Sequence, residues 1–121
     1  MSEGPVIQEL TGGRLHLSHG PIDVVLKAFG EKVGVAQAYA AAAERFATIL
    51  PELCAELALL RAPAGSAEPQ SPVGRRMVAA CLPFQPIFIT PMAAVAGAVA
   101  DELMATLRAC AARARLRERR R

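Results

Sequence analysis

Residues 14–29 read RLHLSHGPIDVVLKAF, and this stretch decides the fold class. Its first half alternates polar and apolar side chains with a period of two, which is typical of a half-buried strand. Residues 22–29 are β-branched and mostly apolar, which favours a second strand. Because Gly20 and Pro21 separate these segments, the sequence predicts a β-hairpin that turns between them.

An amphipathic helix is predicted downstream of the hairpin, over residues 33–50. Apolar side chains recur there at three- and four-residue spacing, with polar side chains elsewhere on the helical wheel. Pro51 lacks a helical N–H and restricts the residue before it, so the helix is expected to end or bend at Leu50. Pro51 can then open a second helix, with Leu53, Leu57 and Leu60 on one face.

The next two segments are shorter. Residues 62–72 read APAGSAEPQSP, and their Pro, Gly and Ser content predicts a surface linker. Residues 73–82 fit either a helix or a strand, because periodicity alone does not decide for a short apolar run, and we favour the helix.

Prolines organise the last part of the chain. Pro83 and Pro86 predict an extended segment. Thr90 and Pro91 predict a helix start, since the Thr hydroxyl can cap free N–H groups and Pro fits the first helical position. The helix is expected to run from Pro91 to about Leu107. Together with the hairpin, these elements predict an α+β protein.

The charge of the chain is unevenly distributed. The 121 residues suit one domain with a modest core, in which 25 Ala must pack beside Leu, Val and Ile. Residues 108–121 hold seven Arg and one Glu, whereas residues 1–107 carry a net charge of −3. The body lacks the interleaved basic and aromatic residues of a nucleic-acid surface, so specific nucleic-acid binding is not expected.

Cysteine usage and apolar runs predict a cytoplasmic protein. Cys54, Cys81 and Cys110 are odd in number and widely spaced, which favours small buried side chains over disulfides or a zinc site. The N-terminus has no export-signal pattern, and the longest apolar stretch is too short to span a bilayer. No membrane association is expected. His16 and His19 are interpreted as strand-surface or turn residues, since no catalytic partner is identifiable.

The helix expected over 91–107 holds the candidate site residues. Gly97 costs about 1 kcal/mol relative to Ala inside a helix, so either close packing or the approach of a ligand would explain it. Free amides beyond Thr90 favour anionic groups such as phosphates, although capping is the simpler role. Asp101 and Glu102 could approach a metal or a ribose hydroxyl, and a solvated helix face is the plainer alternative.

Four segments carry a family resemblance: RLHLSHGPID (14–23), AAERFATILPEL (42–53), RRMVAAC (75–81) and FITPMAAVAGAVADE (88–102). They resemble an uncharacterised family within the ApbE-like superfamily, which includes the FAD:protein FMN transferases. In those transferases, the stretch D-L-G-G-x-A-K-G-x-x-x-D opens a helix at the flavin site. Gly97 and Asp101 match its late Gly and Asp, whereas Thr90, Met92, Ala93 and Ala96 replace the first Asp, the two Gly and the Lys.

The resemblance implies a nucleotide-like ligand, FAD or FMN with Mg²⁺, that the full-length form would bind at Thr90, Gly97 and Asp101. No catalytic residue and no metal ligand are assigned. The resemblance assigns residues 14–107 to the N-terminal part of an ApbE-like domain. Residues 1–13 are polar and Gly-rich, which predicts a flexible N-terminus, and residues 108–121 form an Arg-rich tail. The tail stands where the family continues with further strands and a Gly-Gly-Asp loop. The chain is therefore expected to be a truncated ApbE-like fold that is inactive by itself.

Two function classes remain open from the sequence. One is the flavin-binding, ApbE-like protein that the resemblance implies. The other is a small non-enzymatic module that assembles through Ala-rich helices, with itself or with others, while its basic tail contacts an acidic partner. Nucleic-acid binding through the tail alone would give only salt-dependent, unspecific attachment. Bound flavin, detected by colour or fluorescence, would distinguish the first class from the second.

Overall fold

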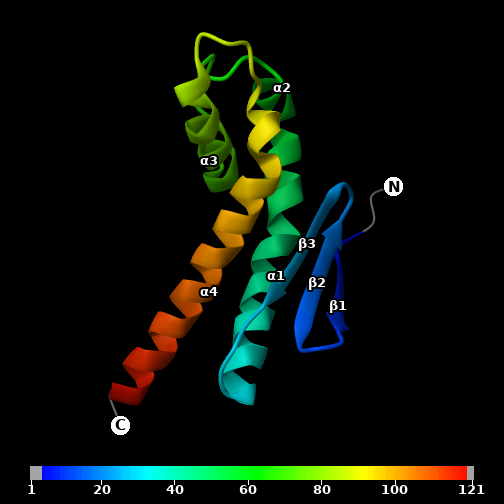
Figure 1. The fold of residues 1–121 in the computed structure, drawn as a ribbon, viewed down its shortest axis with the longest axis vertical. Helices are drawn as coiled ribbons and strands as arrows, with labels where there is room; N and C mark the ends of the chain where they lie inside the picture. The colour runs from blue at the N-terminus through cyan, green and yellow to red at the C-terminus, as the bar shows by residue number, and fades with distance from the viewer. Residues whose placement is uncertain (1–3, 120–121) are drawn as a thin grey trace. The chain divides into compact units, whose positions relative to one another are not determined.

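The structure is a computed structural model that describes residues 4–119. It confirms the predicted α+β class, with a sheet at the N-terminus followed by helices (Figure 1). The elements are β1 (Val6–Leu10), β2 (Arg14–His19), β3 (Ile22–Lys27), α1 (Lys32–Ala55), α2 (Leu57–Leu60), α3 (Pro72–Cys81), the 3-10 turns η1 (Leu82–Phe84) and η2 (Pro91–Ala94), and α4 (Val95–Arg119). Two compact units divide the described chain: unit 1 takes residues 4–48 and 103–119, and unit 2 takes residues 49–102.

Unit 1 contains an antiparallel sheet in the order β1-β2-β3. The predicted hairpin is confirmed, because β2 and β3 pair from His19 opposite Ile22 to Arg14 opposite Lys27. Gly20 sits in the turn with a φ of 56°, a left-handed conformation that glycine adopts without strain.

The prediction that residues 1–13 form a flexible N-terminus is wrong for β1, which pairs with β2 along its whole length. Residues 1–3 lie outside the described part of the chain. β1 is an edge strand, and its side chains are exposed except for the half-buried Leu10. Because the strand has no buried face, it needs no alternation of polar and apolar residues, and no such pattern marks it as a strand. Gly12 and Gly13, with φ of 80° and 75°, make the turn to β2.

The core of unit 1 lies between the sheet and α1. Leu15, Leu17 and His19 alternate along β2 and are buried, as the period-two pattern predicts. Ala42 and Phe46 are buried on α1, and the rings of His19 and Phe46 meet with centroids 6.3 Å apart.

One tyrosine ties α1 to two loops of unit 1. The Tyr39 hydroxyl donates a hydrogen bond to the Gly13 carbonyl at 2.6 Å and accepts one from the Ala28 N–H at 2.9 Å. These bonds hold the β1-β2 turn and the end of β3 against the helix.

Helix α1 is longer than predicted, because Pro51 does not end it. A proline inside a helix removes one backbone hydrogen bond, here to the carbonyl four residues earlier. Ile49 and Leu53 on either side of Pro51 are buried in unit 2, and this packing supports the helix through the missing bond. The second helix accordingly starts at Leu57 rather than at Pro51.

Unit 2 places its helices around an aliphatic core. The favoured helix over residues 73–82 is confirmed as α3. Residues 62–71 form the predicted connection without regular structure, but Ala64, Pro69 and Ser71 are buried in it, so it is not wholly the predicted surface linker. The segment expected to be extended at Pro83 instead begins with η1, because Pro83 fits the start of a 3-10 turn. The buried apolar side chains of this unit include Ile49, Leu53, Leu60, Val73, Met77, Val78, Cys81, Val99 and Ala98.

Helix α4 begins later and ends later than predicted. Residues 91–94 form η2, and the regular helix starts at Val95. It continues through the Arg-rich segment to Arg119 instead of ending near Leu107. Ala and Arg are strong helix formers, which explains the continuation. No helix among residues 4–119 combines the length and apolarity that crossing a membrane requires.

Candidate functional site

The three predicted site residues lie in unit 2, and Thr90 does not act as the expected cap. Its side chain makes no capping hydrogen bond at the start of η2. Its carbonyl accepts hydrogen bonds from the Ala93 N–H at 3.1 Å and from the Cys81 thiol at 3.6 Å. The intervening 3-10 turn keeps Thr90 outside the first turn of α4, so the proposed helix-terminal site is not built there.

Gly97 and Asp101 lie one turn apart on α4, and both are exposed. A Cβ atom built on Gly97 would meet nothing within 4 Å. The interpretation of Gly97 as a point of close packing is therefore wrong. Thr90 precedes the regular helix and does not share this face.

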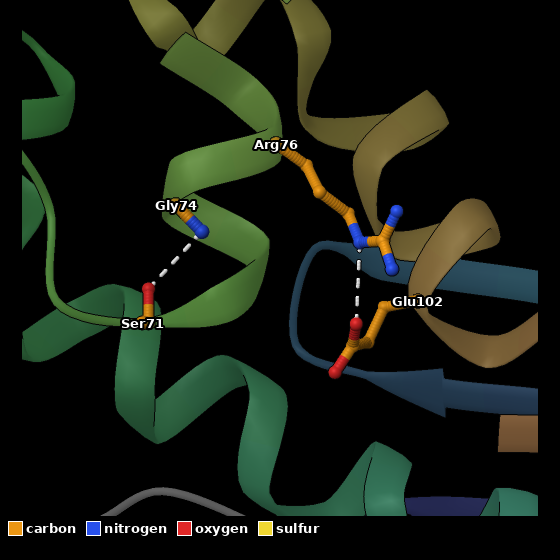
Figure 2. A network of polar contacts seen from close by, with 4 residues as sticks. All are labelled: Ser71, Gly74, Arg76 and Glu102. Atoms are coloured by element: carbon orange, nitrogen blue, oxygen red, sulfur yellow. Dashed lines mark hydrogen bonds and ion pairs between the residues drawn. The ribbon is translucent and has the colours of Figure 1, made fainter. Parts of the chain in front are cut away.

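The N-terminus of α3 already holds an anionic group from the chain itself. The Glu56 carboxylate accepts hydrogen bonds from the Gln70 N–H, from the Ser71 N–H and, at 2.7 Å, from the Ser71 hydroxyl. The same hydroxyl accepts a hydrogen bond from the Gly74 N–H at 3.1 Å, as Figure 2 shows. Glu56 thus orients the capping residue of α3.

These contacts determine the titration of Glu56. Partial burial by itself would raise the pKa of this carboxyl. Hydrogen bonds from Ser71 and from the Gln70 and Ser71 N–H groups, together with the charge of Arg75, outweigh burial and lower the pKa below its ordinary value. Glu56 is therefore a structural carboxylate that stays ionised at neutral pH.

Glu102 is a second structural carboxylate, and Figure 2 shows it paired with α3. Its Oε1 atom lies 3.2 Å from Arg76 Nε, and its side chain is only 13% exposed. The plainer alternative for Asp101 and Glu102, a solvated face, holds for the exposed Asp101 but not for Glu102.

Of the two histidines, His16 matches the predicted surface position and His19 does not. His16 is half-buried on β2 and pairs with Asp23 on β3, as a strand-surface residue would. His19 is buried against Phe46, contrary to the prediction of a surface or turn residue, because the alternation of β2 carries through to its last residue. Among residues 4–119, no three His, Cys, Asp or Glu side chains gather as metal ligands would.

All three cysteines are free thiols. Cys81 and Cys110 are buried, as predicted for small apolar side chains, whereas Cys54 is exposed. Cys54 lies in the last turn of α1, on a face that the core residues Ile49 and Leu53 leave to solvent.

A groove in unit 1 was not predicted from the sequence. It has a volume of about 290 Å³, at the small end of the range for ligand pockets. Small and apolar side chains dominate its lining, which comes from the β3-α1 loop, the first turns of α1 and the C-terminal part of α4. These residues include Ala28, Phe29, Gly34, Val35, Ala38, Leu107, Cys110, Ala111 and Ala114.

Polar and charged groups border this groove. Glu31 and Gln37 lie on the side of α1, and Arg115 lies on α4. Phe29 at the entrance is 83% exposed, and the Lys27 ammonium lies 5.0 Å from the centre of its ring. A groove between helices leaves no local motif, so the available signals were the small residues Gly34, Ala38, Ala111 and Ala114 at helical spacing.

A second hollow lies in unit 2, beside the loop at residues 85–89. Pro63 and Ala64 form its other side. The loop is fixed by a hydrogen bond from the Gln85 side-chain amide to the Ala64 carbonyl at 2.9 Å and by one from the Ala64 N–H to the Ile89 carbonyl at 2.8 Å. Ile87 and Phe88 stay exposed on it. No charged side chain lines this hollow, so it offers little specificity.

Comparison with known proteins corrects the family resemblance. Residues 7–117 match the model of a family described as AbpE bacteria, a different family from the ApbE-like flavin transferases. No curated protein and no solved structure matches the chain. The expectations of a partial ApbE-like fold and of a truncation at residue 107 lose their basis, because the match includes most of the Arg-rich segment. The chain belongs to the family described as AbpE bacteria.

Proposed function

We propose that this chain is a small non-enzymatic interaction module that binds an acidic protein partner. The observation that carries this proposal is the apolar groove of unit 1, which Arg115 borders. It corresponds to the second function class left open by the sequence. The flavin hypothesis rested on a resemblance that the family match corrects, and Thr90, Gly97 and Asp101 line neither of the two hollows described above.

An exposed apolar side chain at the groove supports a binding role. Phe29 lines the groove and, at 83% exposure, is among the most exposed large apolar residues of the described chain. Exposed apolar surface beside a groove is typical of interaction sites. An aromatic side chain at the entrance is the type of residue that dominates binding energy.

The charge of α4 favours an acidic partner. From Leu103 to Leu116 the helix carries Arg108, Arg113 and Arg115, all exposed, and no Asp or Glu. Such a helix attracts acidic surfaces and speeds their association at low salt. We place the module in the cytoplasm, which its three free thiols support.

Binding of acidic, apolar peptides tests the proposal. Two peptide sets, one designed as helices and one as strands, would be compared with charge-reversed versions of the same sequences. Phe29→Ser and the double variant R108E/R115E should each weaken binding of the acidic peptides by about tenfold or more.

Matched controls lie in unit 2. Phe88→Ser removes a comparably exposed aromatic ring, and Arg61→Glu reverses an exposed arginine outside the groove. Both should change the affinity by less than about twofold. Failure of every acidic peptide to bind, or equal losses in both groups of variants, would refute the proposed function.

A further inference from the structure

We infer that the groove of unit 1 receives the apolar face of an acidic amphipathic helix supplied by the partner. This inference rests on the proposed function and specifies the conformation and the charge pattern of the bound segment. Helix-in-groove recognition uses apolar anchors at helical spacing, and it needs a groove whose walls allow a close approach.

The walls have this character. The groove is lined on one side by Gly34, Val35 and Ala38 of α1, and on the other by Leu107, Ala111 and Ala114 of α4. Ala38 follows Gly34 by four residues and Val35 by three, and Leu107, Ala111 and Ala114 are spaced by four and three, so each helix presents a continuous stripe. Glycine and alanine leave room for a third helix, whose axis can then approach within about 8–10 Å of its neighbours.

The arginines set the charge pattern of the occupant. Arg108 and Arg115 are exposed and seven residues apart, which places them on the same side of α4 at a rise of about 10 Å. If a bound helix runs along α4, two of its carboxylates can pair with Arg108 and Arg115 when they are also seven residues, or two helical turns, apart. Glu31 lies on the opposite border of the groove and repels carboxylates there. The acidic side of the bound helix must therefore face α4.

The alternative binding mode is the addition of an extended peptide to an edge of the sheet. β1 and β3 are both edge strands, and an extended peptide could pair with either of them. Neither strand contributes a residue of its own to the lining of the groove, and Arg108 and Arg115 both lie on α4. On the edge strands, β1 carries no basic residue and β3 carries Lys27 alone. The helical site therefore combines the apolar groove with a pair of arginines, which neither edge strand does.

The test is selection and measurement with defined peptides. A displayed library would hold helical peptides of about 18 residues, long enough to form helix in water. Two Glu would be fixed seven positions apart, and the apolar face would be randomised around one Trp. The chain itself contains no Trp, so a blue shift of peptide fluorescence reports entry of the ring into the apolar groove.

Two glycine variants locate the site. Gly34→Leu fills the groove, while a Cβ at this position meets nothing within 4 Å, so the helix tolerates the change. Gly97→Leu is the matched control, because Gly97 is also an exposed helical glycine with open space around it and lies in unit 2. We expect Gly34→Leu to weaken peptide binding by about tenfold and to abolish the blue shift. Gly97→Leu should leave both unchanged.

The outcomes separate this inference from the proposed function. If only strand-forming acidic peptides bind, in a manner that depends on Arg108 and Arg115, the inference is overturned and the proposed function stands. Helical binding that persists when the apolar face is replaced by Ser also overturns it, because charge alone would then suffice. If no acidic peptide of either kind binds, both fail.

Discussion

Ser71-Pro72 begins α3 and Thr90-Pro91 begins η2, so the chain contains two turns in which a hydroxyl residue precedes a proline. At the first, the Ser71 hydroxyl caps the Gly74 N–H. At the second, the Thr90 side chain caps nothing. The difference is Glu56, which accepts hydrogen bonds from the Ser71 hydroxyl and from the Gln70 and Ser71 N–H groups, 14 and 15 residues away in the chain. A hydroxyl residue before a proline therefore forms a cap only at Ser71, where the distant Glu56 carboxylate orients the hydroxyl.

The largest expected effect comes from Gly74, which lies inside the Ser71 cap. A Cβ at this position would stand 2.7 Å from Ser71 Oγ, 2.9 Å from Pro69 Cβ and 3.0 Å from Glu56 Oε2. Gly74→Ala should destabilise the protein by about 1–3 kcal/mol through overpacking. Urea unfolding measures the loss. An unchanged unfolding midpoint would show that the cap is not closely packed.

Glu56 provides the next test. Glu56→Gln removes the charge that accepts three hydrogen bonds and should cost about 1–2 kcal/mol at neutral pH. Glu44→Gln, at an exposed position on α1, is the control for loss of one carboxylate and should have the smaller effect. Equal losses in the two variants would contradict the special role of Glu56.

The same residue predicts a pH dependence. The pKa of Glu56 is lower in the folded chain than its ordinary value of 4.5, so the ionised carboxylate stabilises the fold above that value. This contribution is lost as the pH falls from 4.5 through the lower folded pKa. The stability difference between wild type and Glu56→Gln should therefore shrink in acid. A difference that stays constant from neutral pH to about pH 3 would refute the mechanism.

The two hydroxyl residues can be compared directly. Ser71→Ala should cost about 1 kcal/mol, because it removes the cap of α3. Thr90→Ala should stay within about 0.5 kcal/mol, because no capping bond is lost. Melting temperatures of the two variants check this. Equal destabilisation would mean that Thr90 caps the chain in solution after all.

The smallest effect is a gain. Gly97→Ala should stabilise the protein by up to about 1 kcal/mol, because alanine favours the helix and its Cβ meets open space. Gly97 is thus the counterpart of Gly74, since one glycine is required by its neighbours and the other is not. Destabilisation by Gly97→Ala would show that its face of α4 is covered in solution.

Sequence patterns predicted the elements whose burial is periodic. The hairpin with Leu15 and Leu17, the first helix with Phe46, and α3 were all recognised from their own residues. The errors fell where distant contacts decide. Helix α1 continues past Pro51 because buried residues on either side of it pack in unit 2. The exposed strand β1 forms because it pairs with β2.

The candidate site was less accessible to prediction than the fold. Thr90, Gly97 and Asp101 were chosen from one helix and a motif resemblance, and the structure leaves the last two on an exposed face. The groove joins residues 28–38 to residues 107–115, which are far apart in the chain. No spacing within either segment reveals that the two meet.

Amide chemical shifts would test the central claim most directly. The isotope-labelled wild-type chain would be titrated with acidic amphipathic helical peptides, and the perturbed backbone amides would be mapped onto the sequence. The account predicts changes concentrated in residues 28–38 and 107–115, which line the groove. Changes confined to the sheet edges or to the loop at residues 85–89, or no changes at all, would contradict it.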